Sequence, residues 1–427
     1  MPHRTTTLHY GHAQVLELQI EADSLLADCT PRGEPVGDVA AETKNALENP
    51  LDYPSWSQTV YPGDRVVIAV DPQLPQASAI LDAVIDATTA ASVSPEDITV
   101  LFAAEAPQHE TAQLDEASLG LQAARQNWQR ASDWASQVKC LLHEPDNRSE
   151  LAFVATTEEG EPLLVNRALA DADVLLPVTV TRSQDALGYC GPHGLLCHTF
   201  GDSTTMRRFR AFHAGQSQPQ ASRWTQRKAD EAAWALGLNF CLHVSPGVNG
   251  GILEILAGKN DSVAKKSAQA FQSAWRYRLP RSADLVIAAV DSPTTTWLEV
   301  AAAVDTAARL VNPDGAIVLL TQLTGPVGRA VQRLAQVESP GEALGSLQTE
   351  SGEDVVAAVA LAHALEQAQV YLVSQLDEDE CHDLHFIPVE DPADVQRLVA
   401  RSQACAVVPS AQLADVRLEH EPADANV

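Results

Sequence analysis

Short apolar runs rich in β-branched residues alternate with longer stretches of helical composition, and this alternation limits the folds open to the chain more than any other feature. Three such runs, residues 65–71, 97–102 and 173–180, lie in the first half of the sequence. Runs of this length that are apolar throughout are typical of strands buried on both faces of a sheet. Helical stretches at 77–91 and 164–172 lie between them. The alternation predicts a mainly parallel sheet covered by helices.

The second half repeats this pattern. Its strand-like runs are residues 284–290, 315–320, 370–373 and 405–409. Its helical stretches are residues 298–311 and 353–368. A chain of 427 residues is expected to form more than one domain, because a single core stops growing at about 250–300 residues. We therefore expect an α/β protein of two domains, residues 1–279 and 280–427, each with a mainly parallel sheet flanked by helices. Parallel sheets collect ligands outside the carboxyl ends of their strands, so the cleft between the domains is the expected site.

The chain is strongly acidic, with 57 Asp and Glu residues against 28 Lys and Arg and a formal net charge of -29. A surface of this sign repels nucleic acid and offers no polybasic contact to a membrane, so neither is an expected partner. No run approaches the ~18–20 apolar residues of a membrane span, and the first residues lack the apolar stretch of a signal peptide. We therefore expect a cytoplasmic protein whose seven cysteines are reduced, buried or ligating.

One loop concentrates residue types that bind metals. Cys190, His193, Cys197 and His198 lie within nine residues, and thiolate and imidazole are the ligands that soft or borderline metals prefer. The spacing of Cys190 and His193 lets two donors meet one ion, whereas the side chains of neighbouring Cys197 and His198 point apart. The alternative is a glycine-rich turn that packs two small buried cysteines.

A short basic segment follows this loop. Arg207, Arg208 and Arg210 precede His213 in a chain that is otherwise acidic. Guanidinium groups hold a carboxylate or phosphate through paired hydrogen bonds, so the segment is a candidate anion site. The alternative is a solvated helix face whose arginines balance neighbouring acids.

Two further loops are better explained by local structure than by ligand binding. Residues 245–251 contain Asn-Gly between two apolar runs, which is the pattern of a hairpin turn, and they lack the lysine of a phosphate-binding loop. Residues 294–297 follow a strand and precede a helix, so a helix N-cap is the simpler interpretation.

Several segments, in order along the chain, resemble one known family. These segments are residues 8–11, 46–50, 61–71, 166–173, 240–258, 282–287 and 304–315. Together they resemble the nickel-dependent lactate racemases over nearly the whole chain. The resemblance implies a nickel-pincer nucleotide at the domain interface, which accepts hydride from C2 of lactate while a histidine removes the hydroxyl proton. It also implies a lysine that tethers this cofactor in a glycine-rich loop, and one histidine ligand to nickel.

The residues that carry this chemistry match the family poorly. The resemblance retains Asp71, but Gln73-Leu74-Pro75 replaces a Thr-Arg-Pro sequence, so the arginine that grips the cofactor phosphate is absent. His109 matches the acid/base histidine only with a small loop insertion. His193 or Gly194 stands in the place of the tethering lysine, and the place of an upstream histidine holds Ser183 or Gln184.

These matches and the loop residues together define the candidate site. His213 lies where the nickel ligand is expected, while Glu299 and Ala302 take the places of the Gln and Lys that grip the substrate. The candidates are His109 and His193 for proton transfer; Asp71, Gly191, Gly194, Arg207 and Arg208 for the cofactor; and Cys190, His193, His198 and His213 for a metal.

Two functions fit this sequence. The first is a metal-dependent racemase or epimerase of a 2-hydroxy acid, which uses nickel or a nickel-pincer nucleotide through altered ligands. The second is a catalytically inactive descendant that binds a nucleotide, an acid metabolite or a protein partner in the cleft. Joint loss of the lysine, the arginine and the Gln/Lys pair favours the second function, whereas their replacement by Cys and His favours changed chemistry.

Overall fold

The computed structural model describes residues 3–103, 132–134, 136–183, 187, 191–216, 218–292, 295–325 and 327–419. It divides into two compact units, which we call the central unit, Gly33–Phe271, and the terminal unit, Met1–Arg32 with Gln272–Val427. The sequence places a domain boundary near residue 280, whereas in the structure the chain re-enters the terminal unit at Gln272. Residues 1–32 also belong to the terminal unit, because their strands pack on and pair with its sheet.

The central unit contains a six-stranded sheet in the order β11-β10-β9-β4-β5-β6. Neighbouring strands are parallel except for the antiparallel pair β10 and β11. The strands are β4 (Val66–Val70), β5 (Ile98–Phe102), β6 (Lys139–Leu142), β9 (Val174–Val180), β10 (Phe240–Pro246) and β11 (Ile252–Lys259). The three strands predicted from apolar runs in the first half are therefore confirmed. The predicted hairpin is also confirmed: β10 and β11 are joined through Val248–Gly250, where Asn249 has a φ of 54°.

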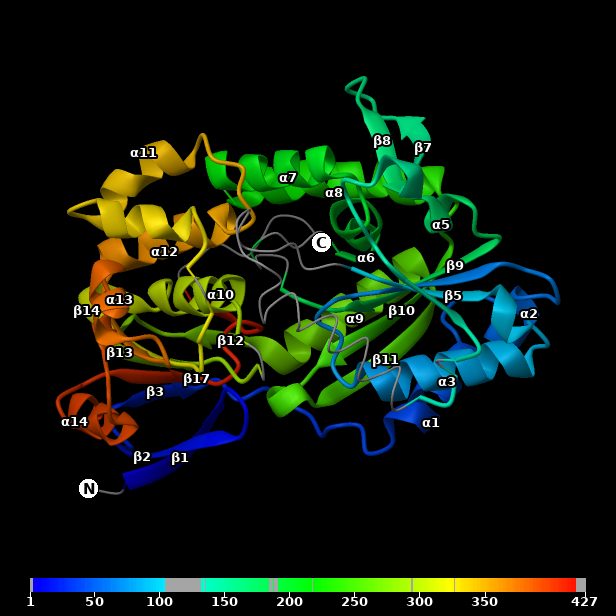
Figure 1. Cartoon of the computed structure of the whole chain (residues 1–427). Coiled ribbons are helices and arrows are strands. Elements are labelled where there is room, and N and C mark those ends of the chain that lie inside the picture. Colours follow the sequence, from blue (N-terminus) through cyan, green and yellow to red (C-terminus); the bar gives the residue numbers. More distant parts are fainter. Residues whose placement is uncertain are drawn as a thin grey trace. The chain divides into compact units, whose positions relative to one another are not determined.

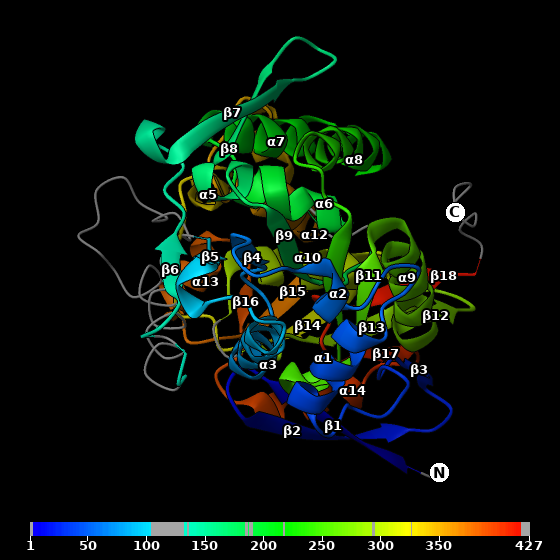
Figure 2. The ribbon, with the colours of Figure 1, turned by 90° about the vertical axis from the view of Figure 1, so that its right-hand side faces the viewer.

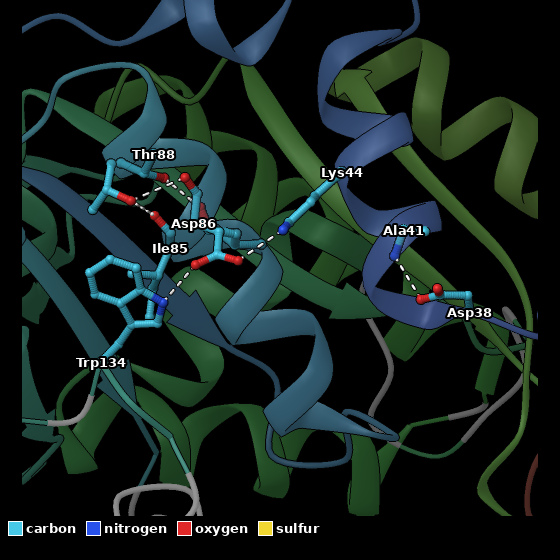
Figure 3. Close-up of polar contacts among 9 residues, drawn as sticks. Asp38, Ala41, Lys44, Ile85, Asp86, Thr88 and Trp134 are labelled. Carbon is cyan, nitrogen blue, oxygen red and sulfur yellow. Dashed lines mark hydrogen bonds and ion pairs between the residues drawn. The ribbon is translucent and has the colours of Figure 1, made fainter.

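Helices α1 (Val39–Glu48) and α3 (Ala77–Ala90), with the short α2 (Trp56–Thr59), cover one face of this sheet (Figure 1). Asp38 begins α1 by accepting a hydrogen bond from the amide of Ala41. Asp86 of α3 joins two neighbouring segments, because its carboxylate pairs with Lys44 Nζ of α1 at 2.8 Å and accepts a hydrogen bond from Trp134 Nε1 at 2.7 Å (Figure 3). These contacts join α3 to α1 and to the segment that contains Trp134.

The other face is covered by the segments between β6 and β10. They are the hairpin β7 (Leu151–Thr156) and β8 (Pro162–Asn166), α5 (Arg167–Ala170), α6 (Gly191–Gly194), a π-helical turn (Leu195–Thr199), α7 (Ser203–Gly215) and α8 (Gln218–Ala235). The predicted helix at 164–172 is wrong in its first part. Residues up to Asn166 form β8, and the Asn166 side chain then caps α5 by accepting from the amide of Ala168.

The terminal unit contains a second six-stranded sheet, in which all paired neighbours are parallel, in the order β16-β15-β14-β13-β17-β3. Its strands are β3 (Leu25–Asp28), β13 (Ala283–Ala289), β14 (Val311–Leu320), β15 (Gln369–Val373), β16 (Ile387–Pro388) and β17 (Cys405–Val408). A further pair joins β12 (Arg276–Leu279), which follows α9 (Asn260–Trp275), to β18 (Asp415–Leu418). The strands predicted in the second half are confirmed.

The hairpin of β1 (His3–Tyr10) and β2 (Gln14–Glu21) shares an apolar core with one face of this second sheet, beside α14 (Val395–Val399). Helix α10 (Trp297–Ala308) packs on β13 and β14, with α12 (Val355–Gln367) next to it. The predicted N-cap of α10 is confirmed, since Thr296 and Glu299 form a reciprocal capping box. Figure 2 shows the same ribbon from a second direction.

Both units thus confirm the predicted α/β class, with mainly parallel sheets flanked by helices. The interdomain cleft stays a prediction. Among the described helices, none combines the length and the apolar character needed to cross a membrane.

Candidate functional site

A row of buried polar side chains crosses three adjacent strands of the central unit near their carboxyl ends. Thr179 of β9 is the register partner of His243 of β10. Asp71 directly follows Val70 of β4, whose partner in β9 is Val178. Asp71, Thr179 and His243 are 5%, 3% and 2% exposed. Because parallel sheets bind their ligands at this edge, the row marks the candidate site of the central unit.

Asp71 links the loops that follow β4 and β9. Its carboxylate accepts hydrogen bonds from the amide of Gln73 at 3.0 Å, from the amide of Val180 at 3.3 Å and from the guanidinium of Arg182 at 2.8 Å. Arg182 Nε also donates to Gln73 Oε1 at 3.1 Å. The sequence singled out Asp71 as a cofactor residue, but in the described structure its oxygens are engaged by the protein itself.

Arg182 is a residue that the sequence analysis missed. The family resemblance implies an arginine in the loop after β4, where Gln73 stands instead. The guanidinium at this edge comes from the loop after β9, two residues beyond the end of that strand. The only sequence signal was an arginine just past a buried strand, and sequence alone does not show that two strand ends are adjacent.

Three buried atoms of the row have no hydrogen-bond partner among the described residues: Thr179 Oγ1, Thr181 Oγ1 and His243 Nε2. The other nitrogen of His243 lies 3.5 Å from Ser267 Oγ, at the limit of a hydrogen bond. Burial, together with a smaller effect of His193, lowers the pKa of His243 to about 4, although Asp71 opposes the shift. Buried polar groups are normally paired, so neutral His243 and the two threonines indicate a place for a polar ligand or water.

His193 forms a close pair with Asp230. His193 Nδ1, on α6, lies 2.6 Å from Asp230 Oδ1, on α8, and the two side chains are 18% and 52% exposed. Burial alone would raise the pKa of Asp230, but hydrogen bonds from His193 and Gln226 lower it overall. A carboxylate on one ring nitrogen fixes the orientation of an imidazole and leaves its other nitrogen for proton transfer. Helix α6, which carries His193, packs against β9, the middle strand of the row.

Two other predicted metal ligands, His198 and His213, come together. His213, on α7, is 8% exposed, and neither of its ring nitrogens has a partner among the described residues. Burial lowers its pKa to about 4. Burial, and then the neighbouring His213, lower the pKa of His198 well below its usual value, and the ring of His198 meets Phe209 edge-on. Both imidazoles are therefore neutral, the form that binds metals.

The remaining predicted site residues are more scattered. Cys197 is buried among apolar side chains. Gly191 begins α6 with a φ of 67°, which favours glycine, and Gly194 ends that helix. On α7, Arg207 and Arg208 are exposed, and Arg208 pairs with Glu161 at 3.0 Å. His109 and Cys190 lie outside the described residues, so their roles stay predictions.

The described residues fit a tethered nickel-pincer nucleotide only in part. His198 and His213 offer two neighbouring neutral imidazoles, but no group of three or more His, Cys, Asp or Glu side chains suited to a metal occurs in the described ranges. The sequence has no lysine between Lys139 and Lys228, and Lys228 pairs with Glu159 at 3.3 Å. Covalent attachment in that loop does not fit, and no step below passes through such a cofactor.

Another buried histidine of the central unit has a structural role. His143 Nε2 lies 2.8 Å from the carbonyl oxygen of Gly201, and its Nδ1 lies 3.1 Å from Asn166 Nδ2. Both nitrogens are satisfied, in contrast to those of His213. A Cβ at Gly201 would overlap the carbonyl oxygen of Cys197, so this close backbone approach requires glycine.

Comparison with known proteins agrees with this architecture. Residues 10–209 match the family described as the lactate racemase N-terminal domain. The lactate racemase apoprotein from Thermoanaerobacterium thermosaccharolyticum superposes with a TM-score of 0.76 at 16% identity, covering 97% of this chain and 100% of that one. A protein from Thermotoga maritima superposes with a TM-score of 0.62 at 14% identity, covering 90% and 99%.

No curated protein sequence matches the chain. At these identities the solved structures establish the fold, while the family match identifies a domain. Over residues 10–209 the chain therefore carries the lactate racemase N-terminal domain.

Proposed function

We propose that this protein is an isomerase of a 2-hydroxy acid, in which His193 carries the proton to and from the substrate hydroxyl. The observation that carries this proposal is the 2.6 Å contact between His193 Nδ1 and Asp230 Oδ1. The carboxylate keeps the proton of the neutral ring on Nδ1, so that Nε2 is the atom that accepts a proton. The lactate racemase N-terminal domain supports the reaction class.

The buried row supplies the groups that such a substrate needs. The Arg182 guanidinium, whose side chain is 19% exposed, matches a carboxylate. His243 Nε2 and the two unpartnered threonine hydroxyls are neutral groups suited to hydrogen bonds with a hydroxyl or carboxylate oxygen. The reaction also requires a hydride acceptor, and a bound redox cofactor would supply that chemistry.

Chiral chromatography of single-enantiomer lactate and 2-hydroxybutyrate tests the proposal. The protein is produced with and without the enzymes that make the nickel-pincer nucleotide, and its nickel content is measured in both preparations. We expect His193→Gln to lower the rate of racemisation about 10²–10⁴-fold, the usual contribution of an acid/base group. Asp230→Asn should lower kcat and change its pH profile, because the pair sets the proton position of His193.

His363→Gln is the matched control, because His363 is exposed on α12 of the terminal unit. Full activity of His193→Gln would contradict the assignment of the proton carrier. Tight binding of a 2-hydroxy acid with no racemisation in either preparation would instead favour the inactive, ligand-binding descendant.

A further inference from the structure

The terminal unit contains a cavity of about 310 Å³ that the proposed function does not use. It lies at the carboxyl ends of three neighbouring parallel strands, where it is lined by Thr321 after β14, Ser374 after β15 and Val389 after β16. Tyr10 and Gln14, from the β1–β2 hairpin, line it as well. A cavity of this volume is large enough for a small organic ligand and far larger than a bare metal ion.

Hydrogen bonds fix the walls of the cavity. The amide of Thr321 donates to the carbonyl of Val373, and its hydroxyl accepts from the amide of Leu323 at 2.9 Å. Ser374 Oγ accepts from the amide of Leu376 at 3.2 Å. Each strand end is thus held in place before any ligand arrives, and such preorganisation reduces the entropy lost on binding.

The charge of the lining is of one sign. Glu378, at the start of α13 (Glu378–Asp383), and Glu390, after β16, line the cavity, and no Lys, Arg or His occurs among its described lining residues. The carboxyl group of Glu390 hydrogen-bonds that of Glu378, and this like-charged neighbour raises the pKa of Glu390. A cation between the two carboxylates would relieve their repulsion, whereas an anion would increase it.

Tyr10 adds an aromatic ring and a hydroxyl to the wall of the cavity. The residue is only 6% exposed and lines the cavity. Its hydroxyl has no hydrogen-bond partner in the part of the chain that the structure describes. The hydroxyl oxygen is not among the buried polar atoms that lack a partner in the described residues, so it is open to solvent and can bond to a ligand in the cavity. The aromatic ring also offers a face to a cation or to a carbon skeleton.

We propose that this cavity binds a small organic amine, with its ammonium group between Glu378 and Glu390 and its carbon skeleton against Tyr10. The apolar part of the wall, which includes Leu376 and Val389, suits a carbon skeleton better than a hydrated ion. The described residues also provide no group of three acidic, thiol or imidazole donors for a metal. The site belongs to the terminal unit alone and is independent of the proposed isomerase activity.

Isothermal titration calorimetry of the full chain with phenethylamine, putrescine and agmatine tests this site. Neutral 2-phenylethanol and anionic 3-phenylpropanoate serve as comparison ligands. We expect saturable binding of at least one amine, weakened about tenfold or more by Glu390→Gln or Glu378→Gln, because each removes a charge-assisted contact. Tyr10→Phe should weaken binding while keeping the ring in place.

Glu342→Gln is the matched control, since Glu342 is an exposed acid of the same unit outside the cavity lining. Circular dichroism of each variant checks that the fold is kept. Absence of saturable binding for all three amines overturns the proposal. Equal weakening by Glu390→Gln and Glu342→Gln, or binding of 3-phenylpropanoate as tightly as phenethylamine, overturns it as well.

Discussion

Asp71 is 5% exposed, and its two carboxylate oxygens together accept three hydrogen bonds. Its Oδ1 accepts from the amide of Gln73 and from Arg182, and its Oδ2 accepts from the buried amide of Val180. Asparagine has nearly the same shape but only one acceptor oxygen. Asp71→Asn therefore leaves either the Val180 amide or the Arg182 guanidinium without its acceptor.

The cost follows from these contacts. Loss of a charge-assisted hydrogen bond costs about 1.5–3 kcal/mol, and a buried amide left unpaired costs about 1–3 kcal/mol. The two losses do not add in full, because the single oxygen of asparagine can still accept a hydrogen bond either from the Val180 amide or from Arg182. The Arg182 side chain is also 19% exposed, so water compensates some of the loss. We expect Asp71→Asn to lower the free energy of unfolding by about 2 kcal/mol, near the middle of these ranges.

Urea titration followed by tryptophan fluorescence measures this change. Asp173→Asn is the control, because Asp173 also holds an arginine through two oxygens in the same unit, Arg65 at 2.8 and 3.0 Å. That pair is 59% and 43% exposed, so solvent screening should make its loss much smaller. Arg182→Met combined with Asp71→Asn completes a double-mutant cycle and isolates the energy of the ion pair.

An unchanged free energy of unfolding in Asp71→Asn would refute this reasoning. If substrate or cofactor binding were lost at the same time, Asp71 would be a ligand-binding residue, as the sequence predicted. A cycle with no coupling energy would likewise show that Asp71 and Arg182 act separately.

Two further changes in stability follow from the structure. Because burial lowers the pKa of His243 from 6.5 to about 4, the unfolded chain binds more protons between these values. The stabilisation is complete above pH 6.5 and is lost as pH falls toward 4, by up to about 3 kcal/mol. His243→Gln should flatten this part of the pH–stability curve, and an unchanged slope would contradict the burial of a neutral ring. Thr296→Ala removes the capping box of α10 and should cost about 1 kcal/mol in thermal unfolding, whereas Thr296→Ser should retain the cap; equal losses in both variants would count against the cap.

Much of the fold could be predicted from local sequence, because apolar runs such as 66–70 and 405–408 are buried on both faces and leave little choice of structure. Where a prediction was wrong, tertiary contacts decided. Residues 162–166 form a strand because they pair with β7, and the helix starts only where Asn166 caps it. The place of residues 1–32 was missed for a related reason. Strand β3 pairs with β17, far along the chain, and no local pattern encodes such pairing.

The site was less predictable than the fold. The sequence indicated His193 and the His198–His213 segment, but it assigned the partners by proximity along the chain. In the structure, His193 pairs with Asp230, which is 37 residues away on another helix. Asp71 pairs with Arg182, which is 111 residues away. Asp71 and Arg182 converge because β4 and β9 are neighbouring parallel strands that end at one edge of the sheet, whereas His193 and Asp230 meet because α6 packs on α8. Local sequence determines neither the strand order nor the helix packing.

The pairing of His193 with Asp230 bears on what the altered loop can do. In the family that the chain resembles, the place of His193 or Gly194 holds a lysine. An ammonium beside Asp230 would form a fixed ion pair, because lysine keeps its charge near neutral pH. An imidazole at the same carboxylate keeps one hydrogen bond and can still take up and release a proton at its other ring nitrogen. A histidine next to Asp230 thus suits the proposed role of a proton carrier, whereas it offers no amine for attachment of a cofactor. A proton carrier also needs a substrate that is oriented within its reach. Neutral His243 and the unpartnered hydroxyls of Thr179 and Thr181 are suited to orient such a substrate.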